Sequence, residues 1–371
     1  MKLRIISVVL VTILCIAVVI YLQDEKPSSI KNYLINSKTA CYVENMAMDM
    51  VGKQLIVENL VGNKIYQGNP PRYSLLESMG LLLEYAALAG NSDLFTAVLK
   101  QTINDFMSPE GYFYWRVSLP EKKGSTATAL VDDLRLIKAI YKMDSSKIKG
   151  ESTVINRLSD SIFEFDVREG RFIDYYDGMK AKRLSLFYID VEAMRALAGR
   201  EQRWKAPYYQ ALSVLRQAPQ NKEGFFPAWY DQVEGKYHYP EEVNMIENLY
   251  TAINYQLAGK DAVRFRHFLA KELMEGKISC RYYLDGSPVK EDESAAVYAL
   301  AYRLFMLAGD GQYASQCYAK MLGFQIRDNS KLRGWFGDRV AQNVHSFDQL
   351  EALLTIRMKE GNYYAGEGKR N

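Results

Sequence analysis

The sequence predicts an all-α fold in which a pair of helices repeats six times and closes into a ring. Aromatic loops that contain glycine recur along the chain, beginning at Gly111, Gly170, Gly224, Gly276 and Gly334. Apolar residues recur at helical spacing on both sides of each loop. Convincing period-two alternation is scarce, and the absence of βαβ order and of a phosphate-binding glycine loop argues against a nucleotide fold. A supersecondary unit repeated six times can close into a ring.

The composition is that of an ordinary globular domain. The 371 residues are 48% hydrophobic and 25% charged, with a formal net charge of +3. This balance argues against a polyanionic partner, and we expect no nucleic-acid binding. Aromatic residues are abundant, since 27 tyrosines and 15 phenylalanines exceed what a helical core needs. Tyrosine suits a binding surface that is apolar on its face and forms hydrogen bonds at its rim.

The N-terminal residues 1–26 are typical of a membrane anchor. Two basic residues precede an uncharged run from Ile5 to Leu22, which is marginally long enough to span a bilayer. No small-residue cleavage site follows, so we interpret 1–26 as an uncleaved signal anchor and 27–371 as one domain outside the cytoplasm. A cleaved signal peptide and a lipid anchor on Cys15 are open alternatives, although Leu14 is large for a lipoprotein cleavage site.

Cysteines and histidines are few and isolated. Cys41, Cys280 and Cys317 form no CxxC pair and show no metal-ligand spacing. The three histidines are scattered too, which argues against zinc and against a histidine-dependent triad. We therefore expect no metal, no cofactor and no disulfide framework, as in an exported bacterial protein.

Twelve helices are expected, arranged as six pairs. After a weak stretch at 28–38, helical periodicity covers 72–90, 92–106, 128–143, 152–164, 187–199, 203–217, 242–258, 261–275, 292–308, 310–322 and 346–359. Links within a pair are short and carry a glycine stop followed by a polar cap, as at Gly90 and Asn91. Links between pairs are long and aromatic, with small hairpins expected near 172–175 and 278–283. All long loops therefore fall at one end of the ring, where function tends to collect.

Carboxylates stand near the start of the first helix of every pair. They are Glu77, Asp132, Asp133, Asp190, Glu241, Glu242, Glu291, Asp292, Glu293 and Asp348. In a ring these helix ends converge on one cleft, so acids distant in sequence face one another. Glycoside hydrolysis needs such a pair, because one acid protonates the leaving oxygen while another activates water. The helix dipole also favours acids in any first turn, so each acid taken alone fits a structural role.

Five segments in the right order resemble glycoside hydrolase family 8. Residues 72–83 (RYSLLESMGLLL) resemble the signature SEGQGYGMLLAVLAGD, and residues 129–136 (ALVDDLRL) resemble ATDADLDIA. Residues 187–198 are similar to PSYFAPAAYRLFA, residues 226–231 (FPAWYD) to LIPDWVN, and residues 346–353 (SFDQLEAL) to YYDSVLALL. The similarity covers most of the exported part of the chain.

This resemblance implies an (α/α)6 barrel of six inner and six outer helices that cuts a β-linked polysaccharide with inversion. Glu77 aligns with the general acid, which must stay protonated at neutral pH. The central-subsite aspartate aligns with Asp133, or with Asp132 after a shift of one residue. The expected substrate-binding residues are Tyr73, Trp115, Asp132, Tyr188 and Trp229. For the two tryptophans, loop packing fits as well as sugar stacking.

The resemblance leaves the general base open. The family motif YDAxRxPWR corresponds to residues 239–247 (YPEEVNMIE), in which both arginines are missing. Glu242 lies nearest the base position, and Asp231 in the preceding aromatic loop is the alternative. The loss of the arginine pair indicates a substrate other than cellulose or xylan.

Together these features predict a monomeric, inverting endo-glycoside hydrolase that cleaves a secreted or cell-surface exopolysaccharide. The N-terminal segment would hold it at the membrane, in association with a polysaccharide synthase complex. A catalytically inactive, polysaccharide-binding component of an export system is the main alternative, because the base motif is eroded. A polysaccharide lyase on the same ring would instead need a tyrosine or histidine base.

Overall fold

A computed structural model of the chain describes residues 59–61, 73–118, 123–143, 151–327, 334–337 and 343–361. The expected signal anchor at 1–26, the weak helical stretch at 28–38, Cys15 and Cys41 lie outside these residues. Within the described segments, every helix falls short of the length and hydropathy that a membrane span needs.

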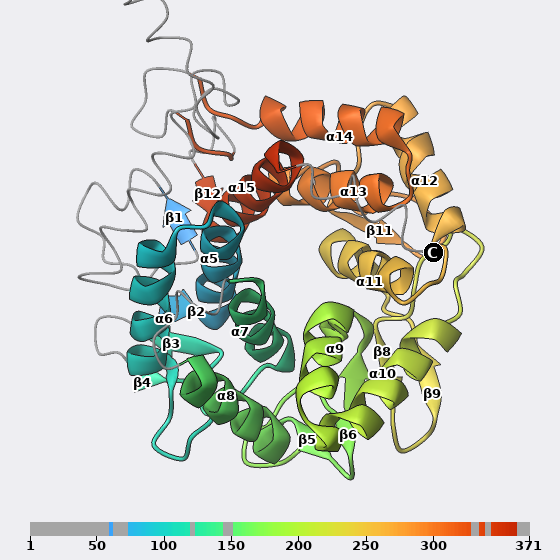
Figure 1. The fold of residues 1–371 in the computed structure, drawn as a ribbon. Coiled ribbons are helices and arrows are strands. Elements are labelled where there is room, and N and C mark those ends of the chain that lie inside the picture. Colours follow the sequence, from blue (N-terminus) through green and yellow to red (C-terminus); the bar gives the residue numbers. More distant parts are fainter. Residues whose placement is uncertain are drawn as a thin grey trace, which may run out of the picture.

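An inner ring of helices forms the wall of a barrel (Figure 1). Its members are α5 (Leu76–Ala89), α7 (Leu130–Lys142), α9 (Val191–Arg200), α11 (Met245–Leu257), α13 (Ala295–Leu307) and α15 (Ser346–Glu360). Each helix packs against the next one in sequence, and α15 returns to α5. Helices α5 and α13 bury residues around most of their circumference, because inner neighbours and outer helices cover them.

The outer layer consists of α6 (Ser92–Phe106), α8 (Glu151–Phe165), α10 (Lys205–Gln217), α12 (Val263–Met274) and α14 (Gly311–Gly323). The α5–α6 link shows the predicted capping. Gly90 ends α5 in a left-handed conformation with a φ of 65°, and the Asn91 side chain accepts a hydrogen bond from the Leu94 amide at 3.0 Å. The predicted (α/α)6 barrel is confirmed, with eleven of its helices in the described residues.

Several inner helices begin later than the sequence pattern predicts. The helices expected from 187, 242 and 292 start at Val191, Met245 and Ala295. Before α9 the chain forms a 3-10 turn, η2 (Leu186–Tyr188), and before α11 it forms the strand β10 (Glu242–Asn244). These residues form their backbone hydrogen bonds with neighbouring loops, so they do not join the helix.

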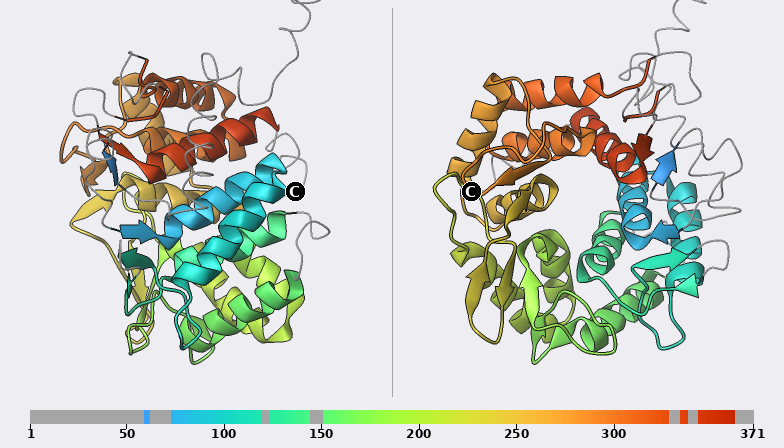
Figure 2. Two further views of the ribbon diagram at one scale, coloured as in Figure 1. Left: turned by 90° about the vertical axis from the view of Figure 1, so that its left-hand side faces the viewer. Right: turned by 180° about the vertical axis from the view of Figure 1, so that it is seen from behind.

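Short antiparallel strands tie the long loops together at one end of the barrel (Figure 2). The strands are β1 (Asn59–Val61), β2 (Tyr73–Leu75), β3 (Arg116–Ser118), β4 (Lys123–Gly124), β5 (Val167–Arg168), β6 (Arg171–Phe172), β7 (Arg183–Ser185), β8 (Trp229–Asp231), β9 (Lys236–His238), β10, β11 (Arg281–Tyr283) and β12 (Asn343–His345). The sheets are β2-β3-β4, β7-β8-β9, β10-β11, β5-β6 and β1-β12. The hairpin expected near 172 is β5-β6, whereas β11 pairs with β10 of the preceding unit.

One hydrogen bond recurs around this end of the barrel. The first amide of an inner element donates to a carbonyl in the loop of the next unit: Leu76 to Trp115 (2.9 Å), Leu130 to Asp174 (3.0 Å), Leu186 to Ala228 (2.9 Å) and Met245 to Cys280 (3.0 Å). Each bond satisfies one of the free amides at a helix start. The loop of the following unit therefore fixes where these four inner elements begin, and after three of them an acid follows one or two residues later: Glu77, Asp132 and Glu247.

Many aromatic residues of the loops belong to the core. Phe225 and Phe226 are fully buried, although they lie in the loop before α11. The Phe225 ring lies 4.7 Å from Phe268, centroid to centroid, in an edge-to-face arrangement. Packing between loops and outer helices thus accounts for part of the aromatic excess.

Candidate functional site

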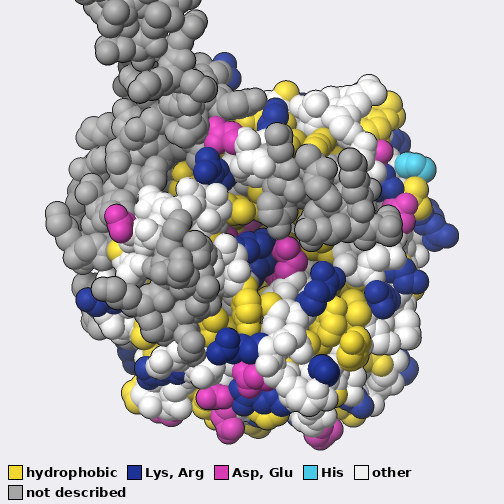
Figure 3. Space-filling view, in the orientation of Figure 1, with side chains coloured by type: hydrophobic (Ala, Val, Ile, Leu, Met, Phe, Trp, Pro, Cys, Tyr) yellow, Lys and Arg dark blue, Asp and Glu magenta, His cyan; other side chains and the backbone are white. Residues whose placement is uncertain are grey.

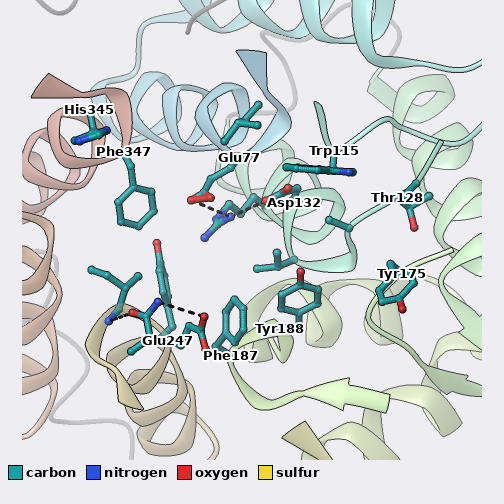
Figure 4. A pocket seen from close by; sticks show the side chains of 18 of the residues that line it. Glu77, Trp115, Thr128, Asp132, Tyr175, Phe187, Tyr188, Glu247, His345 and Phe347 are labelled. Atoms are coloured by element: carbon teal, nitrogen blue, oxygen red, sulfur yellow. Dashed lines mark hydrogen bonds and ion pairs between the residues drawn. The ribbon is translucent and has the colours of Figure 1, made fainter. Parts of the chain in front are cut away.

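The strand-bearing end of the barrel holds a cavity of about 710 Å³, hereafter the mouth cavity. The starts of α5, α7, α11 and α15 line it, together with aromatic residues of the long loops. Glu77 and Asp132 lie on one side, and Glu247, Phe187 and Tyr188 lie on the opposite side (Figure 4). Acids from separate repeats therefore face one another across an open space, as the ring arrangement predicts.

Glu77 is the second residue of α5 and points into the mouth cavity. Its side chain is 26% exposed, and its Oε1 lies 3.9 Å from Nη1 of the buried Arg135. The same nitrogen lies 2.7 Å from Oδ1 of Asp132. Asp132 therefore forms the hydrogen-bonded pair with Arg135, and Glu77 and Asp132 both raise the pKa of this buried guanidinium against the effect of its burial.

Asp132 and Asp133 are neighbours on α7 but face different surroundings, since successive helical side chains point about 100° apart. Asp132 lines the mouth cavity. Asp133 is fully buried and is absent from the cavity lining. This placement corrects the catalytic assignment of Asp133, because a carboxyl group without access to the cavity has no contact with a substrate there. Asp132, the alternative that a shift of one residue gives, is the one of the two that lines the cavity.

Asp133 faces Asp166, which follows α8. Burial and the neighbouring Asp166 carboxyl raise the pKa of Asp133 well above its usual range. Burial also raises the pKa of Asp166 to about 6, against the opposing effect of the Asp133 and Thr128 side chains. Burial therefore favours the protonated form of both carboxyl groups, and neither side-chain oxygen of Asp133 has a hydrogen-bond partner in the structure.

The two predicted general bases lie outside the mouth cavity. The Asp231 carboxylate caps the β8–β9 turn, where it accepts hydrogen bonds from the Val233 and Glu234 amides at 2.8 Å. These bonds stabilise the ionised form and lower the pKa of Asp231. Glu242 is 38% exposed and pairs with Arg281 at 3.2 Å. Both acids are thus held by local contacts, and neither faces Glu77 across the mouth cavity.

Glu247 is an acid that the sequence reasoning did not select. It is the third residue of α11, as Asp132 is of α7 and Asp348 is of α15, and all three line the mouth cavity. Burial raises the pKa of Glu247, partly opposed by Arg281, and the Asn244 amide donates a hydrogen bond to it at 3.3 Å. Counting from the true helix start would have found it. The family motif instead favours Glu242, which precedes the true start of α11 at Met245.

The other acids of the mouth cavity have structural partners. Asp348 accepts hydrogen bonds from the Ser294 hydroxyl (2.6 Å) and the Ala296 amide (2.9 Å), so it caps the start of α13.

The described residues contain no group of three or more His, Cys, Asp or Glu side chains that could hold a metal ion.

Of three aromatic residues predicted to bind substrate, two line the mouth cavity and one does not. Trp115 and Tyr188 line the mouth cavity, and the Arg116 guanidinium lies 4.8 Å from the Trp115 ring centroid. Burial and Asp132 raise the pKa of the Tyr188 phenol, which therefore stays protonated. Tyr73 lies in β2 and lines neither the mouth cavity nor the second, adjoining cavity that is described below. The mouth cavity also contains Tyr175 and Phe347 (Figure 4).

A second cavity of about 400 Å³ adjoins the mouth cavity, and the two share Tyr175, Phe187, Tyr188, Asn244 and Glu247. Together they form one trough. Trp229 lines the second cavity and stacks on His238, with 5.2 Å between ring centroids and an interplanar angle of 6°. The Arg183 guanidinium lies 5.5 Å from the Trp229 ring centroid. Trp229 is thus both a packing residue and a wall of the trough.

Comparison with known proteins identifies relatives of this chain in sequence and structure. No family model matches the sequence. The chain is 27% identical over 297 residues to "Putative lipoprotein YdaJ" of Bacillus subtilis, covering 77% of this chain and 79% of that protein.

Similar solved structures include a novel alpha-amylase from Clostridium perfringens, at a TM-score of 0.74 and 23% identity over 85% of this chain and 97% of that one. PssZ from Listeria monocytogenes has a TM-score of 0.68 and 23% identity, covering 86% and 95%. A reducing-end-xylose releasing exo-oligoxylanase has a TM-score of 0.59 and 16% identity, covering 87% and 93%. These matches confirm, at the level of the fold, the resemblance that the sequence motifs indicate.

Proposed function

We propose that this protein is an inverting endo-glycoside hydrolase that cleaves a secreted or cell-surface polysaccharide. One observation carries the proposal: Glu77 and Glu247 face one another across a cavity lined by aromatic side chains (Figure 4). Inverting hydrolysis requires two carboxyl groups with room for a water molecule between them. The adjoining cavity extends the trough past the two acids, which suits cleavage within a chain.

Glu77 is the proposed proton donor, and Glu247 is the proposed base. Glu77 gives its proton to the glycosidic oxygen as the bond to the anomeric carbon breaks. Glu247 takes a proton from the water that attacks the opposite face of the sugar, so the configuration inverts and the two acids exchange protonation states. Asp132, held by Arg135 at 2.7 Å, is placed to accept a hydrogen bond from the sugar between them.

The glutamine variants at positions 77 and 247 test these roles on the polysaccharide of the source bacterium. Each is expected to lower the release of reducing ends by about 10³-fold, a typical contribution of general acid–base catalysis. Substrates with an activated aryl leaving group separate the roles, because they need little protonation. Glu77→Gln should retain most activity on them and Glu247→Gln should not. Near wild-type cleavage of the polymer by Glu77→Gln would end the proposal.

An inactive, sugar-binding role is the alternative, and it is favoured by the engagement of Glu242 and Asp231 in local contacts. It predicts polymer affinity without new reducing ends, unchanged by substitution of Glu247. A lyase reaction through Tyr188 or Tyr250 is disfavoured, because burial raises the pKa of both phenols. Tyr175 and His345 line the same cavity and are the remaining candidates for a lyase base. An unsaturated product that absorbs in the ultraviolet would reverse this conclusion.

We place the protein outside the cytoplasm, as a monomer attached to the membrane by its N-terminal residues and working beside a polysaccharide synthase complex. Support comes from the uncharged run Ile5 to Leu22 and from the relative described as a lipoprotein. Cell fractionation tests the attachment. The full chain is expected in the membrane fraction and residues 27–371 alone in the soluble fraction. Release of the full chain by Cys15→Ser would assign the anchor to a lipid.

A further inference from the structure

The sheet β7-β8-β9 separates two hollows. Side chains alternate between the two faces of a strand, and the register places Leu184, Tyr230 and Tyr237 opposite one another across the three strands. Arg183, Ser185 and Trp229 come from the alternate positions and line the second cavity of the trough. Leu184, Tyr230 and Tyr237 line a separate groove of about 340 Å³ between this sheet and α10, hereafter the outer groove.

The outer groove has the size and chemistry of a small ligand site. Its volume falls within the range of about 300–1,000 Å³ that is usual for such sites. Ala211 and Val214 of α10 and Phe172 of β6 supply apolar surface, and the Tyr230 and Tyr237 rings lie 4.9 Å apart, centroid to centroid. The Tyr237 hydroxyl donates to the Val214 carbonyl at 2.7 Å, which fixes this ring against α10.

The polar groups of the outer groove are amides and hydroxyls. Gln210, Ser213, Gln217 and Gln232 line it, and Arg171 is the one charged residue in its lining. The Gln232 side-chain amide donates to the Phe172 carbonyl at 2.6 Å, and that of Gln217 donates to Ser213 at 2.8 Å, so the groove is preorganised. A surface that combines tyrosine rings with neutral donors and acceptors matches a sugar, which has apolar faces and hydroxyl groups at its edge.

We propose that the outer groove binds a second, uncharged stretch of the same polysaccharide that the trough cleaves. This inference rests on the proposed function. Trp229 and Tyr230 are consecutive in β8 and face the trough and the outer groove respectively, so one hairpin contacts the polymer on both faces. Two attachment points on one chain raise the affinity for a long polymer, whereas a short fragment occupies only the trough.

Obstruction of the outer groove tests this proposal. Ser213 is exposed on α10 and points into the groove, so Ser213→Trp fills it without removing a core contact. Ser315→Trp on α14 is a matched control, because Ser315 is also exposed on an outer helix and lies outside the groove. Both substitutions are made in the full-length Glu77→Gln variant, and affinity electrophoresis in gels containing the extracted polysaccharide measures binding. Gln210→Ala with Gln217→Ala provides a second perturbation that leaves the tyrosines in place.

The expected result is a loss of polymer affinity of about threefold to tenfold for Ser213→Trp and for the double glutamine variant, with Ser315→Trp unchanged. In the active enzyme, Ser213→Trp should slow cleavage of the polymer but not of short fragments. Equal polymer affinity of all variants, at equal melting temperatures, would contradict the proposal that the outer groove binds the polysaccharide. That result would not affect the proposed hydrolase function, which depends on cleavage by the wild type. If the wild type does not cleave the polymer but Ser213→Trp binds it more weakly, the hydrolase proposal is wrong and the outer groove stands.

Discussion

The two ends of the barrel interior use the same inner helices for different purposes. At the strand-bearing end, acids surround the mouth cavity of about 710 Å³. Further along the axis a cavity of only about 60 Å³ remains, lined by Glu84, Lys138, Lys142, Asp190 and Glu192 among others. We call this the closed end. Figure 3 views the molecule from this end, and basic and acidic side chains lie side by side at its centre.

At the closed end the charges neutralise one another. Lys138 lies 3.0 Å from Glu84 and 2.8 Å from Asp190, and its pKa is raised well above the usual range because those acids outweigh its burial. Tyr250 separates the two ends, since it lines both cavities and donates a hydrogen bond to Glu351. In the proposed function the acids at the mouth take part in the reaction, whereas the charges at the closed end are paired with one another, and the following variants test this difference.

The largest expected effect distinguishes Glu247 from Glu242, which lines only the second cavity of the trough. Glu247→Gln should lower kcat by about 10³-fold, or about 4 kcal/mol, because the base is lost while the fold is kept. Glu242→Gln, which removes only the exposed pair with Arg281, should change kcat by less than about threefold. Initial rates of reducing-end release measure both. A larger loss for Glu242→Gln than for Glu247→Gln would return the base to the predicted position.

Removing a charged residue at the closed end should lower the free energy of unfolding. Arg303→Met leaves the fully buried Glu351 carboxylate without its cation, which lies 2.5 Å away, so the free energy of unfolding should fall by about 3 kcal/mol. Urea unfolding followed by circular dichroism measures the change. Lys271→Met removes the exposed pair with Glu275 and should cost less than about 0.5 kcal/mol. Equal stability of the two variants would contradict the structural role of the closed end.

The buried pair Asp133 and Asp166 should have a smaller effect, which is a fall in the free energy of unfolding as the pH rises. Asp166 has a pKa raised to about 6, so between pH 4 and 6 the folded chain holds a proton that the unfolded chain releases. Wild-type stability should therefore fall as the pH rises through this window. In Asp133→Asn the second buried carboxyl group no longer titrates, so the decline should become shallower, with a gain of about 1–2 kcal/mol at pH 8, while the part caused by the burial of Asp166 remains. Thermal unfolding from pH 4 to 8 measures the change, and parallel profiles of the two proteins would contradict the raised pKa of Asp133.

The smallest expected effect concerns the pH profile of the reaction. Activity should rise with pH as Glu247 ionises, and this limb should lie above the ordinary glutamate range because burial raises its pKa. Arg281 opposes that shift, so Arg281→Met should move the limb of kcat/KM to higher pH. Arg171→Met, in the outer groove, should leave it in place. A limb that moves to lower pH in Arg281→Met would contradict the assignment of Glu247.

The fold could be predicted from the sequence because its signals are local and repeated. Apolar spacing marks each helix, and Gly90 with Asn91 marks a stop and a start that the structure reproduces. The first residues of the inner helices were harder to predict. Whether Glu242 to Asn244 forms a helix turn or a strand depends on pairing with Arg281 to Tyr283, and nothing near position 242 encodes that partner.

The same limit explains which site residues were found. Glu77, Asp132, Trp115 and Tyr188 follow from their positions in the repeat and the motif, and all four line the mouth cavity. Glu247 lines the cavity but was not predicted, and Asp133 was predicted but lies buried away from the cavity, because both placements depend on helix phase. A shift of one residue in α7 exchanges the cavity for the buried contact with Asp166, and the sequence does not record that phase at this precision.

In several repeats the first amide of an inner element donates to the loop carbonyl of the next repeat, and this link affects how proteins with this fold can diversify. A loop transplanted from a related protein brings the carbonyl group that accepts the hydrogen bond from the preceding repeat. The transplanted loop can therefore change the residue at which the inner helix of that preceding repeat begins. Exchanging single loops should therefore disturb two repeats, whereas exchanging adjacent repeats as a block should preserve the donor and acceptor together. Insertions at turns such as Gly235, beyond the strands, escape this linkage, and new specificities are expected to accumulate there.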